Sequence, residues 1–196
     1  PFVRIAPSES AEPGRDVAMD DRTAAGEMTQ YLAGLGHRRI AHISGPVPEV
    51  MSLRRQEGYR RAMRNAGLAI PEGYEQRGDY LLHGGARACE ALFNLPEPPT
   101  AIFVSNDEMA FGAIHHLRET GHDVPGDVSV VGFDDLYLSE AFYPPLTTVS
   151  QPRIDIGRQA MSILLKMLSG AHVPAKPVVL PATLRVRGTT APPKSA

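Results

Sequence analysis

The sequence predicts an α/β fold in which helices cover a mostly parallel β-sheet. Apolar runs of strand length alternate with segments whose apolar residues recur at helical spacing, and this order repeats several times along the chain. Such alternation is typical of βαβ units, because each helix returns the chain to the start of the next parallel strand. In addition, two apolar runs stop abruptly in acidic or amide side chains, at residues 101–108 and 127–135.

Four apolar segments are predicted as strands: FVRI (2–5), RRIAHIS (38–44), TAIFVS (100–105) and DVSVVGF (127–133). A short strand is also expected just before Tyr80, and the alternating tail TLRVRGTT (183–190) is a further candidate. The prolines of FYPPLTTVSQP (142–152) exclude a helix there and predict an extended crossing.

Five further segments have the apolar spacing of helices. The first follows Asp20 and Asp21 and ends at Gly36, the second ends at Gly67, the third contains Cys89, the fourth ends at Gly121 and the fifth ends before Gly170. Glycine directly after a helix is typical of a left-handed C-cap. At the start of the fourth helix, Ser105-x-x-Glu108 has the spacing of a capping box, and Asp107 is expected to cap the helix.

The composition indicates a soluble globular protein that does not bind DNA by itself. The chain has 196 residues, 42% of them hydrophobic, and a formal net charge of -2, which provides no field to attract phosphate backbones. Cys89 is the single cysteine, which excludes an intramolecular disulfide and fits a reducing, cytoplasmic compartment. No stretch approaches the roughly 20 apolar residues of a membrane span. Because the chain begins PFVRIAP, without Met or a leader, we expect a piece of a longer protein.

Motifs for catalysis or metal binding are not evident. GLGHRR (34–39) has only the first two glycines of a dinucleotide fingerprint, and neither P-loop spacing nor a G-x-S-x-G elbow occurs. The adjacent His115 and His116 point to different sides of a helix, which is unsuitable for joint metal ligation. We therefore expect no enzyme activity, no cofactor and no metal. A carbohydrate hydrolase using Asp107 and Asp134 is the enzymatic alternative.

Polar side chains at two strand ends predict a pocket. AIFVSND ends in Asn106 and Asp107, and DVSVVGFDD ends in Asp134 and Asp135. In open α/β sheets this carboxyl edge is where ligands bind. Arg54 and Arg55 are expected in the first turn of a helix, where the helix dipole disfavours a cation, so a partner should require one there. A solvated surface charge is the alternative for either arginine, as ordinary rim packing is for Tyr80.

Six motifs together resemble the lactose repressor and galactose repressor family of bacterial transcription regulators. They are LGHRRIAHISGP (35–46), RRQEGYRRAM (54–63), PPTAIFVSNDEMAFGAI (98–114), VPGDVSVVGFDD (124–135), PPLTTVSQP (144–152) and LRVRGTT (184–190). The resemblance implies a periplasmic-binding-protein-like fold of two doubly wound parallel-sheet subdomains with a ligand cleft between them. It also implies that a DNA-binding headpiece and part of the N-terminal subdomain lie before Pro1. We expect residues 1–37 and 151–175 in the N-terminal subdomain, and 38–150 and 176–196 in the C-terminal one.

The resemblance also implies the binding residues. Arg55, Asn106 and Asp134 match the family's arginine, strand-end amide and carboxylate, Tyr80 matches an aromatic against the ligand, and Phe133 is a further candidate. An arginine, a carboxylate, an amide and an aromatic face suit a polyhydroxylated ring, so we expect a sugar as the effector. A nucleobase or an acidic metabolite stays an alternative, because the arginine could instead bind a carboxylate.

The resemblance favours a homodimer that reaches operator DNA only through the headpiece. We expect the C-terminal subdomain to form the dimer interface, at the apolar or aromatic residues Phe111, Leu138, Phe142 and Tyr143. For Phe111, a place in the core is an equal alternative. The alternative function is a periplasmic sugar-binding protein of a transport system, which shares the two-lobed fold.

Overall fold

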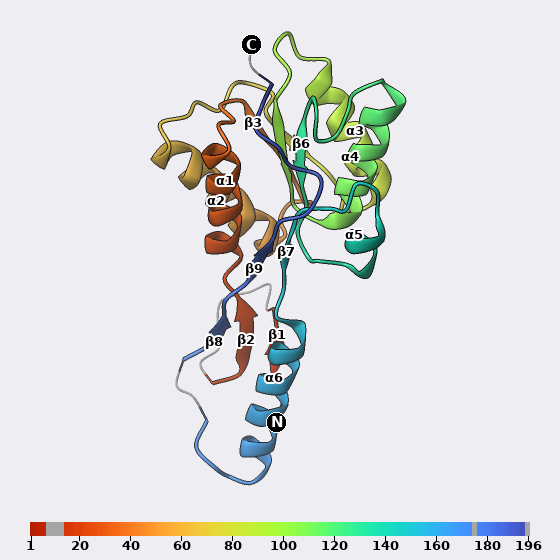
Figure 1. The fold of residues 1–196 in the computed structure, drawn as a ribbon. Helices are drawn as coiled ribbons and strands as arrows, with labels where there is room; N and C mark the ends of the chain where they lie inside the picture. The colour runs from red at the N-terminus through yellow and green to blue at the C-terminus, as the bar shows by residue number, and fades with distance from the viewer. Residues whose placement is uncertain (7–13, 174–175, 195–196) are drawn as a thin grey trace.

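A computed structural model describes residues 1–6, 14–173 and 176–194 and confirms the α/β fold. The chain forms a larger and a smaller body joined by extended segments, with the N-terminus in the smaller body and the C-terminus in the larger (Figure 1). Among the described residues no helix is both long and apolar enough to cross a membrane.

The larger body is built on a parallel four-stranded sheet. Its strand order is β4 (Glu75–Arg77), β3 (Ile40–Ser44), β5 (Ala101–Val104) and β6 (Ser129–Val131). One face is covered by α1 (Asp21–Gly34) and α2 (Val50–Asn65), and the other by α3 (Leu82–Phe93) and α4 (Asp107–Glu119) (Figure 1). Because both faces are covered, the central strands are buried along their whole length, which explains their continuous apolar runs.

The smaller body is a parallel sheet with a single long helix against it. The strand order is β1 (Arg4–Ile5), β2 (Asp16–Met19) and β8 (Val178–Leu180). The helix α6 (Arg153–Leu168) buries Ile156, Ala160 and Ile163 against Val17 of β2.

The bodies are linked where β2 leads into α1, where β7 (Thr148–Ser150) leads towards α6, and where β8 leads towards β9 (Thr183–Arg185). The strands β7 and β9 pair antiparallel beside the junction, and the short helix α5 (Tyr137–Ala141) precedes β7. The extended crossing predicted for 142–152 is therefore confirmed.

The helix ends agree with the sequence predictions except at the start of α4, where the cap differs, and at the start of α2, which begins at Val50 and therefore earlier than expected. Glycines with positive φ follow four helices, at Gly36, Gly67, Gly121 and Gly170. Asp20 caps α1 by accepting hydrogen bonds from the backbone N and the hydroxyl of Thr23, at 3.0 and 2.7 Å. The helix α4 is capped by Asn106, so the predictions that Ser105 forms a capping box and that Asp107 caps the helix are wrong.

Two segments lie in a different body from the one expected. The helix α1, within the range 1–37 assigned to the smaller body, packs on α2 through Met28 and Leu32 and belongs to the core of the larger body. The strand β8, within the range 176–196 assigned to the larger body, pairs with β2. Both boundaries differ because the chain crosses directly after β2 and directly after β8. We propose that the described residues within 1–19 and 153–180 form the smaller subdomain.

Candidate functional site

Arg55 is held in place by contacts on three sides. It lies in the second turn of α2, not the first, because that helix already begins at Val50. Its Nε donates to Oδ1 of Asp21 at 2.8 Å, and its Nη1 donates to the Ser105 carbonyl at 2.5 Å. The guanidinium carbon lies 3.8 Å from the centre of the Phe133 ring. Only 4% of Arg55 is exposed, so the alternative of a solvated surface charge is wrong.

Asp134, which follows the carboxyl end of β6, lies beside Arg55. Its Oδ1 is 3.7 Å from Nη1 of Arg55 and accepts a hydrogen bond from Gln151 at 2.5 Å. The side chain is 22% exposed. Burial raises the pKa of Asp134 to about 6, although Arg55 and Gln151 act in the opposite direction. Its φ of 121° is unusual for a residue with a side chain, and such strain is typical of functional sites. We name Asp21, Arg55, Phe133 and Asp134 the Arg55 cluster.

Asn106 and Tyr80 are connected to each other at the end of β5. The Asn106 Oδ1 accepts from the Met109 backbone N at 3.0 Å, and its Nδ2 donates to the Tyr80 carbonyl at 2.9 Å. Both ends of this amide are therefore committed within the protein. Tyr80 has a φ of 67°, and its ring lies so close to Gly45 that a Cβ there would be 2.2 Å from Cζ. Burial raises the pKa of the Tyr80 hydroxyl above its ordinary value, although the charge of Arg55 acts in the opposite direction.

Phe133 is fully buried and does not offer its face to solvent. Its ring lies under the Arg55 guanidinium and 6.4 Å from the ring of Phe103. It therefore supports the arginine from the core of the larger body, which is a different place from the pocket wall expected for it.

Asp107 is a structural centre that the sequence did not reveal. Its carboxylate is fully buried and accepts hydrogen bonds from the Leu136 backbone N at 2.8 Å and from the hydroxyls of Ser139 and Thr148, both at 2.5 Å. These donors tie the start of α4 to α5 and β7. Gly132 leaves room for it, because a Cβ there would be 2.3 Å from Oδ1.

Asp21 is the second residue whose role the sequence missed. Aspartates at a helix start commonly cap it, and Asp20 does cap α1. Asp21, in contrast, is buried and pairs with Arg55. The only signal was the doublet itself, because one acid is enough for a cap.

Asp135 fastens the junction between the two bodies. Its Oδ1 lies 2.7 Å from Nη2 of Arg187, next to β9, and its carbonyl accepts from Arg153 at the start of α6 at 2.8 Å. Burial alone would raise the pKa of Asp135, but the hydrogen bonds from Arg187 and Ser150 and the charges of Arg187 and Arg185 together outweigh burial and lower this pKa.

The predicted dimer residues divide between core and surface. Phe111 is buried, and its ring is 4.7 Å from the half-buried Phe142, so its place in the predicted interface is wrong and its core alternative is confirmed. Leu138 and Tyr143 are 59% and 81% exposed, and Tyr137, which precedes Leu138 in α5, is exposed as well.

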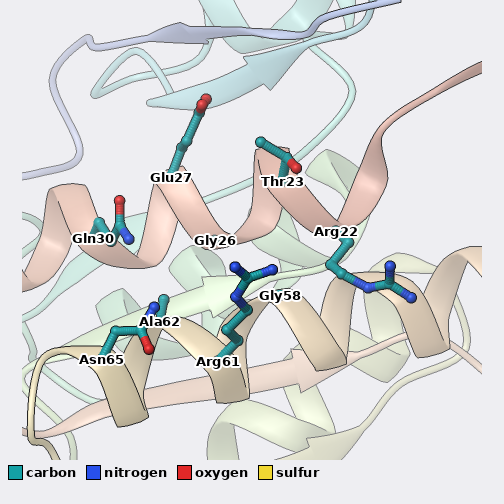
Figure 2. A pocket seen from close by; sticks show the side chains of 9 residues that line it. All are labelled: Arg22, Thr23, Gly26, Glu27, Gln30, Gly58, Arg61, Ala62 and Asn65. Atoms are coloured by element: carbon teal, nitrogen blue, oxygen red, sulfur yellow. The ribbon is translucent and has the colours of Figure 1, made fainter. Parts of the chain in front are cut away.

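A cavity of about 230 Å³ lies elsewhere, between α1 and α2 (Figure 2). The helices come close there because Gly26 faces Gly58, where a Cβ would be 2.3 Å from the Arg22 carbonyl. Arg61 and Asn65 line this cavity, and the Arg55 cluster does not.

Comparisons with known proteins agree on one family. Residues 29–190 match the model of the periplasmic binding protein-like domain. The chain is 40% identical over 174 residues to the HTH-type transcriptional repressor CytR of Escherichia coli K12, covering 89% of this chain and 51% of that protein. It therefore spans about half the length of such curated relatives.

Solved structures extend the match to almost the whole chain. A sugar-binding transcriptional regulator of the LacI family from Escherichia coli, complexed with phosphate, has a TM-score of 0.92 at 28% identity, covering 98% of this chain and 69% of that one. The transcriptional regulator CelR in complex with cellobiose has a TM-score of 0.88 at 35% identity, covering 96% and 58%. The chain therefore belongs to the periplasmic binding protein-like domain family, in its lactose repressor and galactose repressor branch.

Proposed function

We propose that this chain is the effector-binding core of a bacterial transcriptional regulator. It binds a small polyhydroxylated molecule, for which a sugar is the best candidate, between its two bodies. A DNA-binding part outside these 196 residues contacts the operator. On this proposal the chain is no enzyme and works in the cytoplasm. The periplasmic transport alternative is not favoured, because the relatives compared above are named repressors and regulators.

The observation that carries the proposal is the pairing of Arg55 with Asp134. The Nε and Nη1 of Arg55 are engaged within the protein, whereas its Nη2 makes no hydrogen bond to any described residue. The partly exposed carboxylate of Asp134 lies beside Arg55, with its Oδ1 3.7 Å from Nη1. A planar donor beside an acceptor suits two neighbouring hydroxyls, one of which accepts while the other donates. The cellobiose complex of a relative supports a carbohydrate.

The two sides of the cluster require different variants. Arg55→Ala would leave Asp21 buried without its partner, and breaking a buried pair costs about 3–5 kcal/mol of stability. We therefore expect Arg55→Ala to lower the melting temperature as well as the affinity. Asp134→Asn is the cleaner test, because the residue is partly exposed and the amide has nearly the same shape.

Calorimetric titration with neutral mono- and disaccharides tests the proposal. Asp134→Asn should weaken binding of the best ligand by about tenfold to a hundredfold, since removing a partner of a charged hydrogen bond costs roughly 1–3 kcal/mol. Asp155→Asn is the control, because Asp155 is exposed on α6 and pairs only with Arg158 among the described residues. Unchanged affinity in folded Asp134→Asn would place the ligand elsewhere.

We also propose that the exposed surface of α5 and of Tyr143, which follows it, forms a homodimer interface. Leu138 and Tyr143 are apolar or aromatic side chains that the chain itself does not cover. Leu138→Glu should shift the sedimentation of a micromolar sample to that of a monomer. Leu165→Glu is the matched control, because Leu165 is 58% exposed, almost as much as Leu138, but lies on α6. Monomeric wild-type protein at that concentration would contradict the interface.

A further inference from the structure

The charge of Arg55 is neutralised before a ligand arrives. Asp21 lies 2.8 Å from Nε, and the two side chains are only 5% and 6% exposed. A buried ion pair with this geometry is screened little by salt. Arg55 can therefore still donate hydrogen bonds through Nη2, but it adds little net positive charge to the site.

Further carboxylates make the surroundings of Arg55 acidic. Asp134 lies 3.7 Å from Nη1 on the side that is partly open. Asp107 is buried nearby, acts to raise the pKa of Asp134, and is satisfied by hydroxyl and amide donors that carry no charge. Two carboxylates thus lie within 4 Å of one guanidinium, and the charge of a third, Asp107, acts on Asp134.

Neither neighbouring basic group relieves this excess. Arg187 is 2.7 Å from its own carboxylate partner, Asp135. His42 is fully buried, and burial lowers its pKa to about 4, so the ring is neutral. A ligand at Arg55 Nη2 therefore meets hydrogen-bond donors and acceptors in a field that is negative.

We propose that this site takes polyols that are uncharged or carry an ammonium group, and that it discriminates against polyols bearing a carboxylate or phosphate. This inference rests on the proposed function, because it specifies the ligand of the same site. A carboxylate or phosphate held by Arg55 would approach both Asp21 and Asp134. The repulsion between like charges a few ångström apart at a partly exposed site corresponds to at least a tenfold loss of affinity.

Calorimetric titration of the chain at pH 7.5 with matched ligands tests the inference. The probes are glucose, glucosamine and glucuronate, together with ribose and ribose 5-phosphate. We expect the neutral or amino member of a set to bind at least tenfold more tightly than its anionic counterpart. An anionic member that binds as tightly as its neutral counterpart, or more tightly, overturns the inference and leaves the proposed sensor function standing. Binding of none of these probes counts against both.

Asp21→Asn identifies the source of the discrimination. The amide oxygen can still accept the hydrogen bond from Arg55 Nε, but the negative charge is gone. We expect the preference for the neutral over the anionic ligand to fall about tenfold. Asp155→Asn removes an equal charge from the exposed face of α6 and should leave the preference unchanged. If Asp21→Asn melts at the wild-type temperature and keeps the full preference, Asp21 is not its origin and the inference fails.

Discussion

Replacing Asp107 with alanine should destabilise the larger body strongly. The carboxylate is fully buried and receives three hydrogen bonds, from Leu136 N, Ser139 Oγ and Thr148 Oγ1. Each hydrogen bond to a charged group contributes roughly 1.5–3 kcal/mol, and the three are not additive because they share one acceptor group. The alanine variant also leaves the buried hydroxyls of Ser139 and Thr148 and the half-buried N–H of Leu136 without this acceptor. We therefore expect a loss of about 3–5 kcal/mol, a large part of the roughly 5–15 kcal/mol of a typical domain.

Equilibrium urea unfolding measures this loss. Glu108→Ala is the control, because Glu108 is the exposed next residue of the same helix, and it should change the free energy of unfolding by less than about 0.5 kcal/mol. The loss for Asp107→Asn should lie between those two values. The amide oxygen can still accept a hydrogen bond, but the amide NH2 group would face the hydroxyl and N–H donors that now bind the carboxylate. A loss below about 1 kcal/mol for Asp107→Ala, with an unchanged denaturant slope, would refute the assignment of Asp107 as a structural centre.

Three further outcomes follow from packing and burial. Gly112→Ala should lower the free energy of unfolding by about 1–3 kcal/mol, because the added Cβ would be 1.9 Å from the Leu82 carbonyl oxygen. Gly34→Ala is the control: its Cβ would meet nothing within 4 Å, so urea unfolding should show a neutral or stabilising effect. Cys89 is buried with its pKa raised by burial to about 12, so a thiol reagent should label it only under unfolding conditions, and rapid labelling of the native protein would contradict this. Burial lowers the pKa of His42 from 6.5 to about 4, so between these pH values His42 is protonated in the unfolded chain and neutral in the folded chain. The free energy of unfolding should therefore fall by up to about 3 kcal/mol as the pH drops from 6.5 towards 4. Urea unfolding of the wild type and of His42→Gln across that pH range would measure this loss.

Much of the larger body could be predicted because its signals are local. The strand predicted at 38–44 contains β3, and the one predicted at 100–105 contains β5. Both faces of these strands are covered by helices, so their apolar runs are unbroken in the sequence. Helix ends were predicted equally well where a glycine with positive φ follows, as at Gly121.

The smaller body was harder to predict because its elements are short and their partners are distant. β2 and β8 have four and three residues, too few for a periodic pattern. They pair with each other across more than half of the chain. Local propensity cannot indicate such pairing, and for this reason the assignment of residues 176–196 differed from the structure.

At the site, the sequence indicated where the polar side chains lie, but it could not indicate which of them caps a helix and which forms buried contacts. Arg55 and Asp134 do lie together, as the family resemblance implied. Asn106 and Asp107 are adjacent polar residues at a helix start, and either could cap it. The cap is Asn106 because Asp107 is turned towards Thr148 in β7, a donor that lies 41 residues further along the chain.

The doublet Asp134-Asp135 joins the proposed ligand site to the junction between the two bodies. Asp134 faces Arg55, while the next residue holds Arg187 beside β9 and, through its carbonyl, Arg153 at the start of α6. Both aspartates have positive φ, 121° and 55°, so their backbone has little freedom to absorb a displacement of one without moving the other. A ligand that draws Asp134 towards its hydroxyls therefore acts on the residue that fixes the start of α6. Since α6 packs against the sheet of the smaller body, the proposed function leads us to expect that occupation of the site biases the angle between the bodies.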